Sequence, residues 1–124
     1  MYELDVLPKL ARRLAEPRRF IQILAGPRQV GKTTLSQQVG SILEFPKHFA
    51  TADEPGIRGP GWLAAQWVVA RELANANEER GGALLVLDEV QKIPGWSETV
   101  KRLWDEDTRD RVPLRVLVLG SAPL

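Results

Sequence analysis

The chain has no cysteine and only one histidine, one tyrosine and one methionine. Without cysteine it can form no disulfide, no thiolate metal site and no thiolate nucleophile. It also lacks an apolar run approaching the ~20 residues of a membrane span, and its first residues lack the apolar stretch of a secretory signal. We therefore expect a cytoplasmic protein with no membrane partner.

The chain also has almost no excess of positive over negative charge. The 124 residues include 17 Lys and Arg against 16 Asp and Glu, a formal net charge of +1. Nucleic-acid-binding domains usually concentrate basic side chains on one face, so nucleic acid binding is not indicated. Residues 1–40 nevertheless carry seven basic and three acidic side chains, which makes this part of the chain the more favourable place for an anion.

Apolar spacing predicts an alternation of strands and helices. With 44% hydrophobic residues the chain can bury the core of one domain. Unbroken apolar runs predict buried strands, whereas apolar residues three and four apart predict helices. Strands are expected over 20–25, 47–51, 83–87 and 114–119, and helices over 5–15, 31–42, from 59–61 to before 81–82, and after 94–95 with Ser97 as N-cap. This order predicts an α/β fold with a mostly parallel sheet.

The first expected strand is followed by a glycine-rich loop that opens a helix. The run Gly26-Pro27-Arg28-Gln29-Val30-Gly31-Lys32-Thr33 matches G-x-x-x-x-G-K-[ST] at every fixed position. In such a loop the backbone N–H groups and the helix N-terminus bind phosphate oxygens, the lysine reaches the β and γ phosphates, and the hydroxyl binds Mg²⁺. The alternative is an ordinary glycine-rich turn, which the strand before the loop and the helix after it disfavour.

Two carboxylates follow the apolar run 83–87. Asp88 and Glu89 would lie at the carboxyl end of a parallel strand, where open α/β sheets bind ligands. Asp88 would then hold Mg²⁺, directly or through water, and Glu89 would act as general base toward an attacking water. A pair of solvated acids at a strand end is the alternative. Ser121 ends the last strand in the same way and either orients that water or is an ordinary turn serine.

The remaining candidates favour structural roles. For His48, a partner or solvent contact is favoured over catalysis because no second ligand or nucleophile has a matching spacing. The four tryptophans, Trp62, Trp67, Trp96 and Trp104, fit core packing better than a stacking surface for single-stranded nucleic acid. Asp53 and Glu54 either assist the site or start a turn.

The segments AGPRQVGKTTL, LDEVQKIPGW, SETVKRLWDED and LRVLVLGSAPL resemble the AAA-type P-loop ATPases of bacteria and archaea. The resemblance extends from about Leu10 to Leu124. It implies a three-layer fold with sheet order 5-1-4-3-2, of which this chain supplies four strands. It also implies Walker B acids at Asp88 and Glu89, the sensor 1 position at Ser121, and a Walker A loop of Gly26, Pro27, Arg28, Gln29, Val30, Gly31, Lys32, Thr33 and Thr34.

The same resemblance leads us to expect that residues 1–124 are the N-terminal portion of a longer ATPase domain. The fifth strand, the helical lid, the second sensor and the region that carries the arginine finger in this superfamily would follow Leu124. A second copy or a partner chain would supply that finger, which can be worth ~10³ to 10⁵ in rate.

The sequence therefore predicts an ATP-binding protein that hydrolyses ATP with Mg²⁺, with Lys32, Glu89 and Ser121 as catalytic residues and Thr33 and Asp88 as metal ligands. The main alternative is a nucleotide-binding module without independent catalysis. A GTPase is disfavoured because no Asn-Lys-x-Asp segment is present, a small-molecule kinase by the acid pair, and an ATP-driven DNA-acting protein by the lack of a DNA-binding element.

Overall fold

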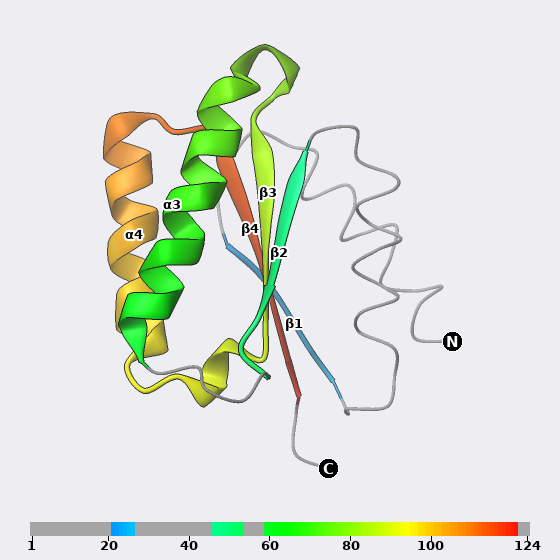
Figure 1. The fold of residues 1–124 in the computed structure, drawn as a ribbon, viewed down its shortest axis with the longest axis vertical. Coiled ribbons are helices and arrows are strands. Elements are labelled where there is room, and N and C mark those ends of the chain that lie inside the picture. The colour runs from blue at the N-terminus through cyan, green and yellow to red at the C-terminus, as the bar shows by residue number, and fades with distance from the viewer. Residues whose placement is uncertain (1–20, 27–45, 54–58, 122–124) are drawn as a thin grey trace.

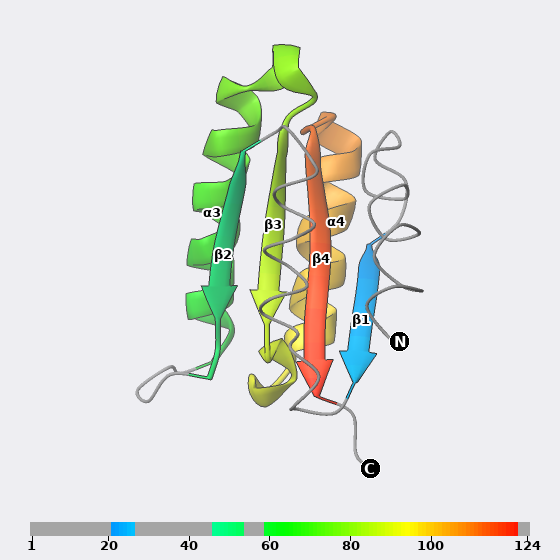
Figure 2. The same cartoon turned by 90° about the vertical axis from the view of Figure 1, so that its right-hand side faces the viewer.

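The computed structural model describes residues 21–26, 46–53 and 59–121. In this part of the chain four strands form one parallel sheet in the order β1-β4-β3-β2. The strands are β1 (Gln22–Gly26), β2 (Lys47–Thr51), β3 (Ala83–Asp88) and β4 (Leu114–Ser121), and their arrowheads all point the same way in Figure 2. The α/β fold class and the order expected for these four strands are confirmed. The helices expected over 5–15 and 31–42 lie outside the described residues.

The two central strands form the core of the sheet. Ala83 to Leu87 of β3 are all buried, as are Leu114 and the run Val116 to Leu119 of β4. Successive side chains of a strand point to opposite faces, so a strand that is covered on both faces needs apolar residues at every position. This requirement explains why the two central strands are continuous apolar runs without alternation.

Two helices cover one face of the sheet (Figure 1). They are α3 (Pro60–Ala76) and α4 (Trp96–Asp110). The buried residues of α3 recur at spacings of three and four and are Leu63, Trp67, Ala70 and Ala74. Proline at the first helical turn fixes φ without losing an internal hydrogen bond, which suits Pro60 as the start of α3. No helix in the described ranges combines the length and the apolar character that crossing a bilayer requires.

Two short 3₁₀ helices complete the described elements. The first, η1 (Glu78–Arg80), follows α3 before the chain enters β3. The second, η2 (Val90–Lys92), follows β3 directly and lies at the carboxyl end of the sheet. Each is a single turn, as is usual for 3₁₀ helices that connect longer elements.

The start of α4 differs from the prediction. Gly95, not Ser97, is the N-cap residue, and the helix has no side-chain cap hydrogen bond. Gly95 adopts φ +72°, a left-handed conformation that glycine reaches at little steric cost. The Gly95 carbonyl accepts a hydrogen bond from the Thr99 N–H at 3.1 Å, so the helix has already begun when the chain reaches Ser97.

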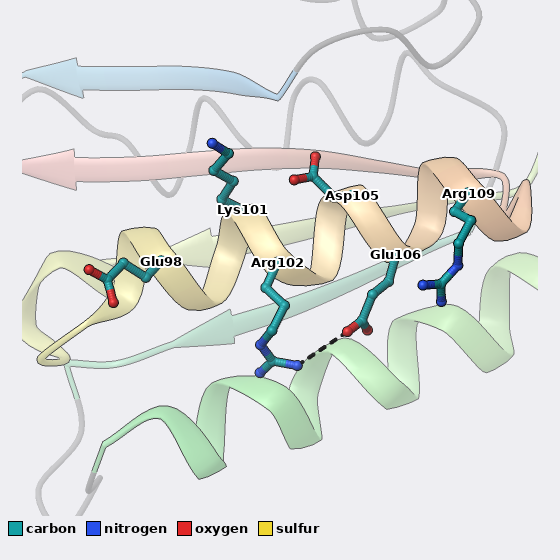
Figure 3. A pocket seen from close by; sticks show the side chains of 6 residues that line it. All are labelled: Glu98, Lys101, Arg102, Asp105, Glu106 and Arg109. Atoms are coloured by element: carbon teal, nitrogen blue, oxygen red, sulfur yellow. Dashed lines mark hydrogen bonds and ion pairs between the residues drawn. The ribbon is translucent and has the colours of Figure 1, made fainter.

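The outer face of α4 is charged and open to solvent. A shallow hollow along it is lined by Glu98, Lys101, Arg102, Asp105, Glu106 and Arg109, all from this one helix (Figure 3). Arg102 and Glu106, four residues apart, form an ion pair at 3.4 Å. Charges of both signs are mixed here, which is typical of a solvated helix face and not of a ligand site.

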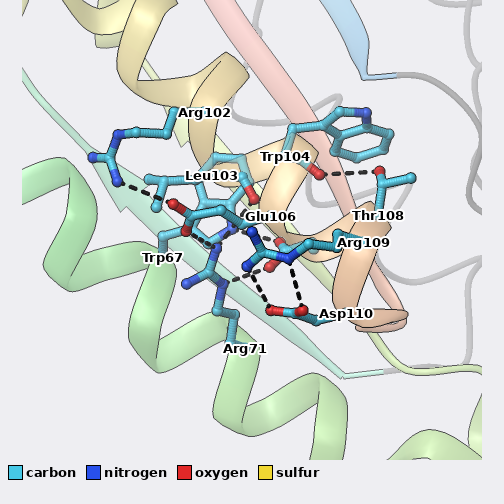
Figure 4. Close-up of polar contacts among 10 residues, drawn as sticks. Trp67, Arg71, Arg102, Leu103, Trp104, Glu106, Thr108, Arg109 and Asp110 are labelled. Atoms are coloured by element: carbon cyan, nitrogen blue, oxygen red, sulfur yellow. Dashed lines mark hydrogen bonds and ion pairs between the residues drawn. The ribbon is translucent and has the colours of Figure 1, made fainter.

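A buried polar cluster joins α3 to α4 (Figure 4). The Trp67 indole Nε1 donates to Asp107 Oδ2 at 2.7 Å, and Arg71 Nε pairs with Asp107 Oδ1 at 2.5 Å. Arg71 Nη2 also donates to the Leu103 carbonyl and to Glu106 Oε1, each at 3.1 Å. The other three tryptophans are half-buried and pack against the core, which confirms that the tryptophans serve packing.

Candidate functional site

The predicted site residues of the described chain meet at the carboxyl edge of the sheet. In the parallel registers Gly26 pairs with Ser121, and Asp88 pairs with Leu119 on one side and Thr51 on the other. Parallel strands end at a common edge, so the start of the glycine-rich loop, the acid pair and the end of β4 share that edge (Figure 2). The rest of that loop, including Lys32, Thr33 and Thr34, lies outside the described residues, and so does the Ser121 side chain.

Asp88 is half-buried and is held from the neighbouring strand. The Thr51 hydroxyl donates to Asp88 Oδ2 at 3.0 Å and accepts a hydrogen bond from the Asp53 N–H at 3.1 Å. The Asp88 carbonyl accepts the Ala52 N–H at 2.8 Å, which continues the pairing of the strands beyond the end of β2. Thr51 therefore orients one oxygen of the carboxylate. This role could not be predicted from the sequence because it depends on the register between β2 and β3.

Glu89 occupies an unusual backbone conformation for a glutamate. Its φ and ψ are 57° and 30°, in the left-handed region, and only 4% of the residue is exposed. The Glu89 N–H donates to the Leu119 carbonyl at 2.9 Å, and its carbonyl accepts the Lys92 N–H at 3.1 Å. A non-glycine residue in this region costs about 1–2 kcal/mol and persists only where its surroundings fix it. The turn buries a carboxylate beside the end of β4.

Gln91 of η2 reaches back to this carboxylate. Its side-chain Nε2 donates a hydrogen bond to Glu89 Oε2. The next residue, Lys92, forms an ion pair with Asp53, which follows the end of β2. Asp53 therefore contacts η2, whereas Glu54 lies outside the described residues. Gln91 was not among the residues predicted for the site, and its position two residues after the acid pair is the only signal for it in the sequence.

His48 does not belong to this constellation. It lies within β2, and its Nε2 is 2.8 Å from Gln66 Oε1 of α3. The contact joins β2 to the helix that covers it. The sequence led us to expect a partner or solvent contact for His48, whereas the described hydrogen bond joins it to Gln66 of the same chain.

The oxygen donors at this edge fit a hard cation. In the described ranges no group of three or more His, Cys, Asp or Glu side chains is arranged to hold a metal on its own. Mg²⁺ bound with a nucleotide does not need such a group, because phosphate oxygens and water supply most of its ligands beside one or two protein oxygens. The Asp88 carboxylate, with Oδ2 fixed by Thr51, is suited to that part.

Comparison with known proteins identifies the family. A model of the AAA domain family matches residues 18–124, which is most of the chain. The chain belongs to the AAA domain family. Members of this family are nucleotide-binding modules of the ATPase type, as the resemblance of the four sequence segments had implied.

Two curated relatives share this AAA domain sequence. They are the uncharacterized proteins Mb2031c of Mycobacterium bovis and Rv2008c of Mycobacterium tuberculosis, each 35% identical over 120 residues. The alignments cover 95% of this chain but 23% of each relative, so the AAA domain chain spans about a quarter of their length.

A solved structure agrees with the fold. A variant of RuvB from Thermotoga maritima superposes with a TM-score of 0.58 at 23% sequence identity. The match covers 98% of this chain and 36% of that chain. At this identity the likeness supports the arrangement of strands and helices of the AAA domain and nothing about what it acts on.

Proposed function

We propose that this AAA domain binds ATP with Mg²⁺ and hydrolyses the bond to the γ-phosphate. The loop Gly26 to Thr34 would bind the phosphates, with Lys32 at the β and γ groups. Thr33 and Asp88 would be the metal ligands, Glu89 the general base, and Ser121 the residue that orients the water.

The observation that supports this proposal best is the common edge of β1, β3 and β4. The loop leaves β1 at Gly26, beside the end of β4, and the acids leave β3 on the other side of β4. Strands in a sheet are about 4.8 Å apart, so β1 and β3 are separated by about 10 Å. A phosphate chain held on the loop would therefore be within reach of the Asp88 and Glu89 side chains.

In the proposed reaction a water oxygen attacks the γ-phosphorus. Glu89 takes the proton of that water as the new P–O bond forms, and the bond from the γ-phosphorus to the bridging oxygen breaks, which leaves ADP and phosphate. Lys32 would neutralise charge on the β and γ oxygens throughout. When bound, Mg²⁺ adds further charge neutralisation at the same oxygens.

Two substitutions test these roles. Lys32→Ala should abolish measurable Mg-ATP binding in calorimetry, because the loop loses its cation. Glu89→Gln should keep the affinity and reduce single-turnover phosphate release by about 10²- to 10⁴-fold, the usual contribution of a general base. The matched control is Glu72→Gln, an exposed position of α3, which should bind and hydrolyse like the wild type. Wild-type turnover in Glu89→Gln would refute the assignment of the base.

The same assay separates hydrolysis from binding alone. Nucleotide binding without phosphate release in the wild type would favour a module that depends on another chain. In that case an arginine from a second copy or a partner would complete the site, as in ATPases that use an arginine finger. A phosphate release rate per chain that rises with protein concentration would support this second candidate.

A further inference from the structure

Glu89 depends on the residues around it for its orientation. The terminal torsion of a glutamate side chain is broad, so burial alone does not fix where the two carboxylate oxygens point. Its backbone is fixed by hydrogen bonds to Leu119 of β4 and Lys92 of η2. The left-handed turn at Glu89 brings residue 91 back over the carboxylate, since η2 begins immediately after it.

The Gln91 amide lies between the ends of β3 and β4. Its Nε2 donates to Glu89 Oε2, which is the only workable assignment for the amide because a carboxylate accepts and does not donate. Its other end lies beside Gly120. A Cβ placed on Gly120 would lie 3.2 Å from Gln91 Oε1, which is closer than most such contacts, and at an ordinary 3.7 Å from Cδ. The glycine therefore leaves the space that the amide occupies.

We propose that Gln91 is a positioning residue that sets the direction of the Glu89 carboxylate toward the reacting water. The hydrogen bond to Oε2 stops rotation of the carboxylate, so Oε1 keeps a single direction. The other end of the amide lies beside Gly120, the residue before Ser121. This inference rests on the proposed function, because positioning matters only if Glu89 acts on a water.

The test uses three substitutions in the intact protein. Gln91→Met keeps the length of the side chain and removes its donor, and Gln91→Glu keeps the shape and replaces the donor with an acceptor. Gly120→Ala adds a methyl group against the amide. The control is Glu72→Gln at an exposed position of α3, outside the candidate site.

The expected result is a separation of kcat from KM. Both Gln91 variants should lower kcat for ATP about 10- to 100-fold, the loss that follows a small misplacement of a reacting group. KM and the calorimetric affinity for Mg-ATP should stay within about twofold, since the described hydrogen bond of Gln91 is to the proposed base. Gly120→Ala should lower kcat less, and Glu72→Gln should leave kcat unchanged. A parallel loss of affinity and kcat would indicate a structural role and overturn the proposal.

A second measurement examines the contact without turnover. The side-chain amide resonances of Gln91, identified by their absence in Gln91→Met, should shift in Glu89→Ala and exchange faster with solvent. Unchanged resonances would overturn the proposal. If the wild type binds and hydrolyses ATP but Gln91→Met does so equally well, only the role of Gln91 is overturned. If the wild type does not hydrolyse ATP, the proposed function is overturned and this inference with it.

Discussion

The Trp67 indole nitrogen and the Asp107 carboxylate form a hydrogen bond of 2.7 Å between two almost completely buried residues. Arg71 pairs with the other oxygen of the same carboxylate, so the charge of Asp107 is matched inside the α3–α4 contact (Figure 4). A buried polar group that loses its partner costs far more than an exposed one. This pair therefore makes a sharp stability prediction.

Asp107→Ala should destabilise the fold strongly. It removes the acceptor of the Trp67 N–H and the partner of Arg71, and breaking a buried ion pair typically lowers the free energy of unfolding by about 3–5 kcal/mol. Urea unfolding followed by tryptophan fluorescence measures the loss. Asp110→Ala is the control on the same helix, and it should change little because the Arg109–Asp110 pair is exposed. Equal losses in the two variants would contradict the buried role of Asp107.

The contribution of Glu106 should depend on pH. The hydrogen bond from Arg71, with further attraction from Arg102 and Arg71, lowers the pKa of Glu106 below its ordinary value of 4.5. A depressed pKa means that the folded state favours the charged carboxylate. The stabilisation is therefore present above about pH 4.5 and is lost as the pH falls through the lower folded-state pKa.

Comparison of the wild type with Glu106→Gln tests whether the stabilisation by Glu106 is lost toward acid pH. The difference in unfolding free energy should be largest near pH 6–7 and should shrink below about pH 4.5. Arg102→Ala should have a smaller effect than Arg71→Ala, since Arg71 is the larger cause of the shift and also pairs with Asp107. A difference that grows toward acid would show that the carboxylate prefers to be neutral in the folded state.

Gly82→Ala should prevent or severely weaken folding. Gly82 has φ +99°, and a Cβ there would lie 1.7 Å from the Pro113 carbonyl oxygen, a backbone atom that cannot move aside. Gly95→Ala is the matched control, because Gly95 also has a positive φ of 72° but a Cβ at that position would meet no atom within 4 Å. It should cost only about 1–2 kcal/mol of backbone strain. Thermal unfolding should show a much lower melting temperature for Gly82→Ala, which has a steric clash, than for Gly95→Ala, which has backbone strain alone. Similar melting temperatures would contradict this account.

Thr51→Val should weaken the use of Mg²⁺ in the proposed reaction. The substitution keeps the shape and removes the hydroxyl that donates to Asp88 Oδ2. Loss of such an orienting partner typically costs about 10- to 100-fold in metal affinity. A titration of nucleotide-dependent activity against Mg²⁺ should show a higher half-saturating concentration. Thr108→Val removes a hydroxyl that bonds the Trp104 carbonyl on exposed α4 and should leave the titration unchanged.

The strands and the parallel sheet could be predicted because their causes are local, whereas the order of the strands came from the resemblance to AAA-type ATPases. The continuous apolar runs of β3 and β4 indicate strands that are buried on both faces. The start of α3 at Pro60 could be predicted because proline is common in the first turn of a helix. The cap of α4 could not be predicted equally well. Both Gly95 and Ser97 are common cap residues, and the choice depends on the turn that follows η2.

The residues that support the site also could not be predicted, and the reason differs from that for the cap of α4. Thr51 matters through a register between β2 and β3, and Gln91 through the left-handed turn at Glu89. Asp107 belongs to a run of charged residues that indicates a solvated face. It is buried only because α3 places Trp67 and Arg71 opposite it. Each role is set by contacts between segments distant in the sequence or by a rare backbone conformation.

The left-handed backbone of Glu89 has a consequence for attempts to make this protein more heat-resistant. Glycine adopts that conformation without a steric penalty, so Glu89→Gly would remove a local source of strain while removing the carboxylate. A screen that selects only for resistance to heating would have reason to replace this residue. A screen for the proposed ATP hydrolysis would have reason to keep it, so the two selections should diverge at position 89.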